Sequence, residues 1–368
     1  MKKVLLGTTA LVTAGLLSSG AFADDEGLTI SVNGYYQAVV STVWSNLDDF
    51  IADEDTVQVK HEGEISFNGS YVMDNGMTAG VEVNLEATNG AGSGTDFDID
   101  EAYAFLEGSF GRIQIGEEAG AAYLMHYTSP YFIGAFGVDS PNFQATARQP
   151  SSPRTATFIT ATGDTNKVTY FTPRVMGIQL GVSYTPQSMI GDTGGQNSQG
   201  ASNSFGVLLE DVGQFDDAID LGVNYSGTID SVELGLSAGL FTADGDNGFD
   251  DPLAVSAGLN IGVGDFLFGA GFYWSDDLRA NDVEEIAYTA AIQYATGPWT
   301  LGAGFLRSEI EGGAADEDSF LVVETGVQYA LGKGVSVFTV FDYYRDHNEF
   351  LDDELNTKAI SAGIDLAF

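Results

Sequence analysis

The chain lacks cysteine altogether and has only 8 proline and 13 basic residues among its 368 positions. Without cysteine, neither a disulfide framework nor a thiolate metal or catalytic site can form. The 13 basic residues face 53 acidic ones, which excludes the basic surface that nucleic-acid binding requires. After residue 23, no window approaches the roughly 20 consecutive apolar residues of a membrane-spanning helix. The fold must therefore depend on packing and backbone pairing, and it is not a helical membrane protein.

The first 23 residues have the pattern of a secretory signal peptide. Lys2 and Lys3 precede an uncharged stretch, and Ala21-Phe22-Ala23 provides small residues three positions and one position before the expected cleavage. We predict that residues 1–23 are removed during export and that residues 24–368 form the mature protein. Loss of the two lysines changes the net charge from −40 to −42.

Short runs of alternating polarity are abundant from residue 28 to the end. In one example, Ala79, Val81 and Val83 fall on one face of an extended chain, and Glu82 and Asn84 fall on the other. This period of two predicts β-strands with one apolar and one polar face. The pattern predicts sixteen strands, at residues 28–45, 57–73, 77–88, 97–108, 112–118, 167–172, 178–186, 218–229, 232–243, 252–263, 266–275, 285–296, 299–310, 319–331, 335–346 and 357–368.

Connection lengths decide between a soluble sandwich and a membrane barrel, because alternation alone fits both. Tight turns such as Asp74-Asn75-Gly76 and Gly332-Lys333-Gly334 alternate with longer connections along the whole chain. This rhythm indicates an all-β fold, a 16-stranded antiparallel up-and-down transmembrane β-barrel with short periplasmic turns and long external loops. An even number of strands closes the sheet and leaves no unpaired edge in lipid. Aromatic residues near strand ends fit interfacial girdles: Tyr71, Tyr184, Tyr225, Trp274, Trp299 and Phe368.

Three segments of the chain carry a resemblance to a known family. They are residues 100–116 (DEAYAFLEGSFGRIQIG), residues 169–186 (TYFTPRVMGIQLGVSYTP) and residues 364–368 (IDLAF). Together they resemble Gram-negative general porins of the alphaproteobacterial type. The resemblance implies an outer-membrane homotrimer, surrounded by lipid and lipopolysaccharide, in which the third external loop folds into the lumen and narrows it. That loop would be Ala119 to Asn166, and its length without periodicity also argues for a function.

Placing the polar face in the lumen predicts a carboxylate-rich stripe on two neighbouring strands, with further charged groups near the long loop. A ring of carboxylates selects cations, and opposed acidic and basic groups create a transverse field. The predicted pore-lining and constriction residues are Lys60, Glu62, Glu64, Glu82, Glu86, Arg112, Glu117, Glu118, Asp139, Arg148 and Arg154. We therefore expect a water-filled channel for passive diffusion of small hydrophilic solutes and ions, with a preference for cations. No cofactor is required for this activity.

An acidic segment in a predicted external loop raises the separate question of calcium. Asp244, Asp246 and Asp250 alternate with glycine and asparagine, as at the start of a calcium-binding loop, where a flexible chain supplies oxygen ligands. The closing glutamate of an EF-hand is missing. Calcium binding at these residues and a solvated acidic loop therefore both remain open.

Rival functions lack the residues that they need. A hydrolase requires a nucleophile, a base and an orienting group, and the only histidines are His61, expected on the lipid face, His347, expected at a loop mouth, and His126, expected to pack within the long loop. A sugar-specific channel needs a row of aromatic residues along the lumen, and Tyr35 and Tyr273 are too dispersed for this. A substrate-specific channel, an outer-membrane enzyme and a structural or adhesive barrel remain the alternatives.

Overall fold

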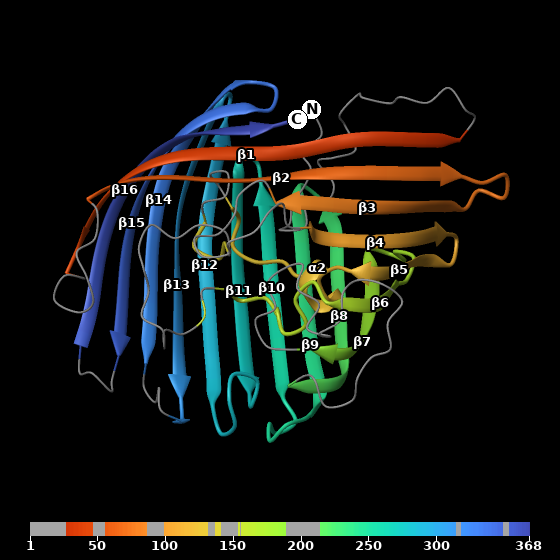
Figure 1. Cartoon of the computed structure of the whole chain (residues 1–368). Helices are drawn as coiled ribbons and strands as arrows, with labels where there is room; N and C mark the ends of the chain where they lie inside the picture. The colour runs from red at the N-terminus through yellow and green to blue at the C-terminus, as the bar shows by residue number, and fades with distance from the viewer. Residues whose placement is uncertain are drawn as a thin grey trace.

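A computed structural model describes residues 27–46, 56–86, 99–131, 137–140, 154, 156–188, 214–313, 318–348 and 353–368. Sixteen strands form one closed, antiparallel, up-and-down barrel in which each strand pairs with its neighbours in sequence and β1 pairs with β16 (Figure 1). The predicted fold class is confirmed. Among the described residues, no helix is long and apolar enough to cross a membrane.

The observed elements follow the alternating pattern closely. They are β1 (Leu28–Ser45), β2 (Val57–Val72), β3 (Thr78–Glu86), β4 (Ile99–Gly108), β5 (Gly111–Glu117), α2 (Ala121–Leu124), β6 (Asn166–Phe171), β7 (Ile178–Ser188), β8 (Phe215–Ile229), β9 (Val232–Gly245), β10 (Leu253–Val263), β11 (Phe266–Asp276), β12 (Glu284–Thr296), β13 (Trp299–Glu311), β14 (Ser319–Gly332), β15 (Val335–Asn348) and β16 (Asp353–Ala367). The short helix α2 was not predicted, because a single helical turn leaves no periodic signal.

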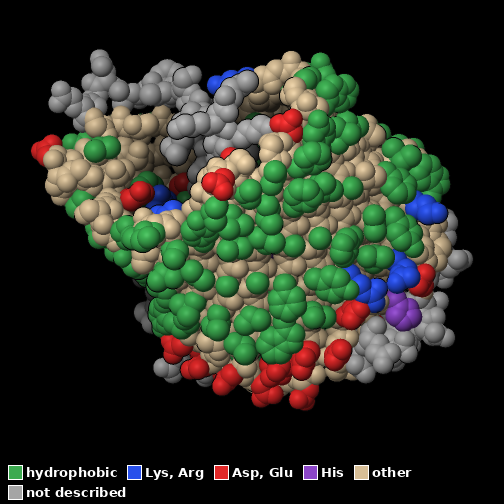
Figure 2. Space-filling view, turned by 180° about the vertical axis from the view of Figure 1, so that it is seen from behind, with side chains coloured by type: hydrophobic (Ala, Val, Ile, Leu, Met, Phe, Trp, Pro, Cys, Tyr) green, Lys and Arg blue, Asp and Glu red, His purple; other side chains and the backbone are tan. Residues whose placement is uncertain are grey.

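The period of two separates an outer apolar surface from an inner polar one. On β7, Ile178, Leu180 and Val182 are exposed, whereas Ser183 and Thr185 are buried inside the barrel. Figure 2 shows the outer surface as a broad field of hydrophobic side chains with acidic side chains along one edge. Several predicted girdle aromatics are exposed, namely Tyr71, Tyr184, Trp299 and Phe368.

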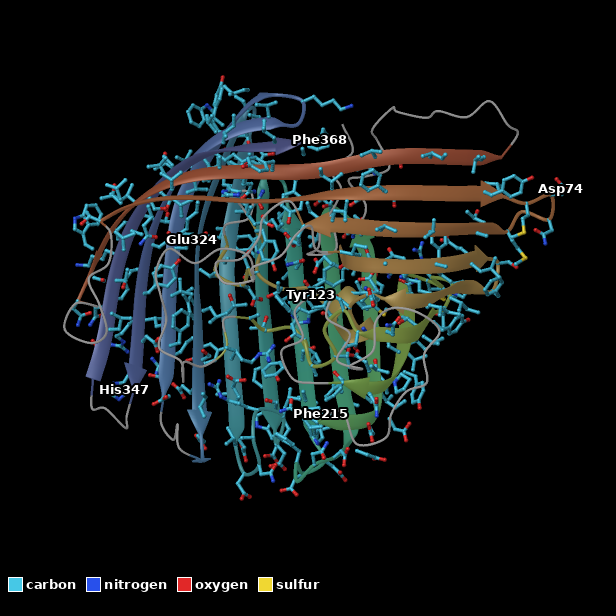
Figure 3. All side chains as sticks on the ribbon, in the orientation of Figure 1. Asp74, Tyr123, Phe215, Glu324, His347 and Phe368 are labelled. Atoms are coloured by element: carbon cyan, nitrogen blue, oxygen red, sulfur yellow. The ribbon has the colours of Figure 1, made fainter. Side chains whose placement is uncertain are left out.

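Short and long connections lie at opposite ends of the barrel. One end carries residues 73–77, 109–110, 172–177, 230–231, 264–265, 297–298 and 333–334, and the other carries longer connections apart from the four residues 349–352. Glycines with a left-handed backbone support the tightest turns, for example Gly264 at φ 61° and Gly297 at φ 56°. In Figure 3, Asp74 marks a turn at the first end and His347 marks the second end.

The main departure from the predicted strands is at the last hairpin. The pairing of β15 and β16 continues past the predicted limits, with His347 opposite Glu354. Leu355 and Thr357 are both buried, so the alternation of inner and outer positions simply continues, and the connection shrinks to 349–352. The predicted signal peptide, residues 1–23, lies outside the described residues.

Candidate functional site

The connection between β5 and β6, residues 118–165, is called the inner loop here. Its described parts lie within the ring of strands, and Tyr123 on α2 sits inside the barrel (Figures 1 and 3). Polar side chains from the inner faces of successive strands hold its backbone. These bonds are Ala121 N–H to Ser183 Oγ at 2.9 Å, Ala122 N–H to Asp220 Oδ1 at 2.5 Å, Tyr127 N–H to Ser237 Oγ at 2.7 Å, Asn224 Nδ2 to Met125 O at 3.1 Å, Asn260 Nδ2 to Thr128 O, and Arg154 N–H to Glu285 Oε1 at 2.9 Å.

Glycines on the same strands let the inner loop lie directly against the wall. A Cβ atom placed on Gly258 of β10 would lie 1.4 Å from the carbonyl oxygen of Tyr127, and one on Gly222 of β8 would lie 2.6 Å from that of Ala121. No side chain can occupy these positions without moving the loop backbone. The wall formed by β7 to β13 is therefore the seat of the inner loop.

Asp139 joins the outgoing and returning limbs of the inner loop. Its carboxylate accepts hydrogen bonds from Thr157 N–H and Thr157 Oγ1, both at 2.6 Å, and from Thr128 Oγ1. The side chain is 0% exposed. The expectation that Asp139 lines the pore is therefore wrong, because its hydrogen bonds enclose it within the loop. His126 is also buried there, with Nε2 3.4 Å from Thr157 Oγ1.

Burial shifts the acid–base properties of both groups. It raises the pKa of Asp139 to about 6, despite the opposing effect of its hydrogen bonds with Thr128 and Thr157. It lowers the pKa of His126 to about 3, so this histidine is neutral at pH 7.

We expect Asp139 to make the inner loop more stable in acid. Its pKa in the folded protein lies above the ordinary carboxyl value of 3.8, so the folded state binds the proton more tightly and this group's contribution to the free energy of unfolding falls as pH rises from about 4 to about 6. The full change is on the order of 3 kcal/mol. The measurement is the difference in unfolding free energy between wild type and Asp139→Asn at pH 4.5 and pH 7. Equal differences at the two pH values would contradict the assignment.

Opposite the inner-loop seat, carboxylates gather on the inner faces of β2, β3 and β4 and on β16, with β1 between β2 and β16. We call them the acid wall: Glu62 and Glu64 on β2, Glu82 and Glu86 on β3, Glu101 on β4 and Asp365 on β16. Register brings them together, since Glu64 lies opposite Glu86 and Gln37 lies opposite both Glu62 and Asp365. Four of these residues belong to the predicted stripe. Glu101 and Asp365 were not in the predicted set, although the alternation along their strands places both on the polar face.

Two tyrosines reinforce the acid wall. Tyr35 donates its hydroxyl proton to Glu62 Oε1 at 2.6 Å, and Tyr103 donates to Glu82 Oε2 at 2.9 Å. Hydrogen bonds of this kind hold carboxylates in fixed positions and are stronger than bonds between neutral groups. These two bonds therefore hold Glu62 and Glu82 in fixed positions within the acid wall.

The described members of the predicted basic set, Lys60, Arg112 and Arg154, do not gather opposite this wall. Lys60 is on β2 beyond Glu62, toward the long-loop end. Arg112 was expected at the base of the inner loop, but it lies at the start of β5, at the short-turn end, with its guanidinium 3.9 Å from the Phe105 ring centroid and 3.4 Å from Glu107 Oε2. A seven-residue strand separates these two ends. Arg148 lies outside the described residues.

Arg154 is held by the seat of the inner loop. Its guanidinium lies 3.8 Å from the ring centroid of Tyr273 on β11 and donates to Phe158 O at 2.6 Å and Tyr273 Oη at 3.2 Å. The side chain therefore braces the returning limb of the loop against the wall. Because this side chain is half-buried, only its exposed part can contact a permeating solute.

Glu117 and Glu118 were both expected at the constriction, and the structure separates them. Glu117 is the last residue of β5, opposite Ala102, and accepts a hydrogen bond from Asn166 Nδ2 at 3.2 Å. It shares the outward side of the strand with exposed Ile115, so its assignment to the constriction is wrong. The adjacent Glu118 points inward and is buried.

Lys167, a buried basic residue beside the inner loop, was not among the predicted residues. Its ammonium donates to the carbonyl oxygens of Gly163 at 2.8 Å and Thr165 at 2.7 Å, and to that of Glu118. A lysine inside the barrel on a six-residue strand carries no distinctive sequence signal. Its burial of 96% becomes visible only once β6 is placed beside the inner loop.

One group of acidic side chains in the described part of the chain has the spacing of a metal site. Carboxylate oxygens of Glu101, Glu118 and Asp164 lie within 4.8 Å of one another. Asp244, Asp246 and Asp250, which are all described, do not form such a group. Instead, Asp246 accepts from Asn247 Nδ2 at 3.2 Å, and the backbone N–H of Asp250 donates to Asn281. The geometry therefore gives no support to calcium at these three residues.

Comparison with known proteins agrees with this architecture. Residues 7–349 match the family described as Gram-negative porin. No curated protein sequence matches the chain significantly.

Solved structures that share the fold have little sequence identity with this chain. One is an anion-selective porin from Comamonas acidovorans, with 12% identity, a TM-score of 0.62, and coverage of 93% of this chain and 100% of that one. Another is the outer membrane protein OmpT of Vibrio cholerae in trimer form, with 14% identity, a TM-score of 0.58, and coverage of 92% and 99%. The outer membrane channel DcaP of Acinetobacter baumannii has 10% identity, a TM-score of 0.61, and coverage of 95% and 100%.

Proposed function

Because the chain belongs to the Gram-negative porin family, we propose that it forms a water-filled outer-membrane channel for passive diffusion of small hydrophilic solutes, with a preference for cations. The acid wall is the observation that carries the preference. Six carboxylates lie on β2, β3, β4 and β16, and the three described members of the predicted basic set, Lys60, Arg112 and Arg154, lie at the two ends of the barrel and at the loop seat. Carboxylates lining a narrow passage raise the local concentration of cations and repel anions.

The fold itself does not determine the sign of the selectivity. The Comamonas acidovorans porin has a similar fold and is anion-selective. Charge selectivity therefore depends on the side chains that line each channel, and in this chain the inner face of β2 to β4 is acidic.

The alternative functions have little support in the geometry. Tyr273 and Phe241 face inward but are 0% exposed, so they cannot form an aromatic path for sugars. His126 is buried within the inner loop, and His61 is on the outer face, stacked on Tyr36 at 5.9 Å. A hydrolytic centre would need an accessible base, so we propose a channel without enzymatic activity.

We further propose that the channel is a homotrimer in contact with outer-membrane lipid and lipopolysaccharide. The trimer form of the Vibrio cholerae protein supports this assembly for a barrel of the same fold. The broad apolar outer surface suits lipid contact, and its acidic edge (Figure 2) is where divalent cations would bridge to anionic lipid headgroups.

Reversal potentials in a salt gradient across a planar bilayer test the proposed selectivity. With KCl on both sides, we expect the sign that corresponds to K⁺ permeating more readily than Cl⁻. An anion preference would overturn the proposal. Liposome swelling with uncharged sugars of increasing size should show a graded decline, and uptake of one sugar alone would instead favour a substrate-specific channel.

A further inference from the structure

The acid wall contains buried hydrogen-bond acceptors to which no described group donates. Two buried amides on it use their NH₂ groups on carboxylates: Gln37 Nε2 donates to Asp365 Oδ1 at 2.9 Å, and Asn84 Nδ2 donates to Glu101 Oε2. Carboxylates accept but do not donate. The amide orientation is therefore fixed, with the carbonyl oxygen on the side away from each carboxylate.

The two amide oxygens left over have no hydrogen-bond donor in the described part of the chain. They are Gln37 Oε1 and Asn84 Oδ1. The carboxylate oxygen Glu62 Oε2 also has no donor. Gln37 is 3% exposed and Asn84 is 5% exposed. A buried acceptor without a donor is costly, so each such group in a native protein needs an explanation.

Register places these acceptors inside the acid wall rather than beside it. Gln37 lies between Glu62 and Asp365, and Asn84 lies between Ser66 and Glu101. Two tyrosine hydroxyls of the wall, those of Tyr35 and Tyr103, already donate to carboxylates. The wall therefore offers negative charge together with two neutral carbonyl oxygens to which no described group donates.

We infer that the acid wall recognises organic cations that carry N–H donors, meaning primary ammonium and guanidinium groups, and passes them in preference to cations of equal size without N–H. Such a solute supplies both components that the wall lacks, since its charge complements the carboxylates and its N–H groups bond the free acceptors. A quaternary ammonium ion supplies only the charge. This inference rests on the cation preference proposed above and adds the chemical class of the solute.

A pair of isomeric ions separates charge from hydrogen bonding. The tert-butylammonium and tetramethylammonium ions have the same composition and charge, but only the first has N–H donors. Reversal potentials under bi-ionic conditions in a planar bilayer give their permeability ratio. We expect tert-butylammonium to be favoured by roughly fivefold, which corresponds to about one net hydrogen bond. A ratio near one in a channel that still prefers K⁺ over Cl⁻ would overturn the inference and leave the proposed function standing. A channel without K⁺ preference would overturn both.

Variants assign the effect to the two amides. Gln37→Met combined with Asn84→Leu removes both acceptors and changes no charge, so the isomer ratio should fall close to one while the K⁺ preference persists. Thr185→Val, which removes a buried polar group from β7 on the other side of the barrel, should leave the ratio unchanged. An unchanged ratio in the double variant would overturn the assignment. If circular dichroism shows that the double variant does not fold, the single variants Gln37→Met and Asn84→Leu are compared with wild type instead. Each should lower the isomer ratio, and an unchanged ratio in both would overturn the assignment.

Discussion

Replacing Glu62, Glu64 and Glu82 with glutamine is expected to bring the ratio of K⁺ to Cl⁻ permeability close to one. A cation within about 5 Å of a carboxylate gains about 0.8 kcal/mol even at the dielectric constant of water. Three carboxylates at different distances from the ion path together correspond to roughly a tenfold change, because ~1.4 kcal/mol is a factor of ten. Glutamine keeps the size and polarity of the side chain, so the measured change reports charge.

A matched control removes the same number of carboxylates from the outer surface. Glu284, Glu309 and Glu354 point outward near the long-loop end, where Glu309 pairs with Arg307 at 2.6 Å and Glu284 accepts from Trp274 Nε1 at 3.2 Å. Substituting these three with glutamine should leave the reversal potential within error of wild type. Measurement at about 0.1 M salt restricts long-range effects, since the Debye length is then about 10 Å. If both triple variants change the selectivity equally, net charge rather than the acid wall controls permeation.

The acid wall could be anticipated because strands carry their geometry in their sequence. Once parity is known, Glu62 and Glu64 must share a face, and a tight turn at Asp74 fixes the neighbouring strand so that Glu82 and Glu86 lie beside them. The pairing between the first and last strands is harder to predict from sequence. Asp365 joins the wall only because β16 closes onto β1, and no local pattern gives that register.

The roles of the charged residues in the inner loop could not be predicted in the same way. The position of this loop inside a barrel follows from family resemblance, but the role of each charged residue depends on contacts that have no period in sequence. Asp139 looked like a pore-lining acid and is instead enclosed by Thr128 and Thr157. Arg154 looked like a basic partner of the wall and is instead stacked on Tyr273. For Glu117, one residue of displacement relative to Glu118 was enough to turn the side chain outward.

The glycines of the loop seat allow a strong test of what holds the inner loop. In Gly258→Ala, the new methyl group would start 1.4 Å from the carbonyl oxygen of Tyr127, whereas ordinary contacts begin near 3.4 Å. The loop must therefore move inward by about 2 Å, and the bond from Tyr127 N–H to Ser237 Oγ, now 2.7 Å, should break. We expect a clear fall in single-channel conductance and a loss of about 1–3 kcal/mol in stability.

The direction of the conductance change follows from which wall the loop leaves. The seat on β7 to β13 is across the lumen from the acid wall, so a loop pushed off its seat moves toward Glu62 and Glu64 and narrows the passage between them. Gly332→Ala on β14 is the control, because nothing lies within 4 Å of its new methyl group, and its conductance should match wild type. A conductance above wild type in Gly258→Ala would mean that the loop has left the lumen. The remaining anchors, Ser183, Asp220 and Asn260, would then have failed to hold it. That result would contradict the seat, because the hydrogen bonds from several strands would all have to break at once.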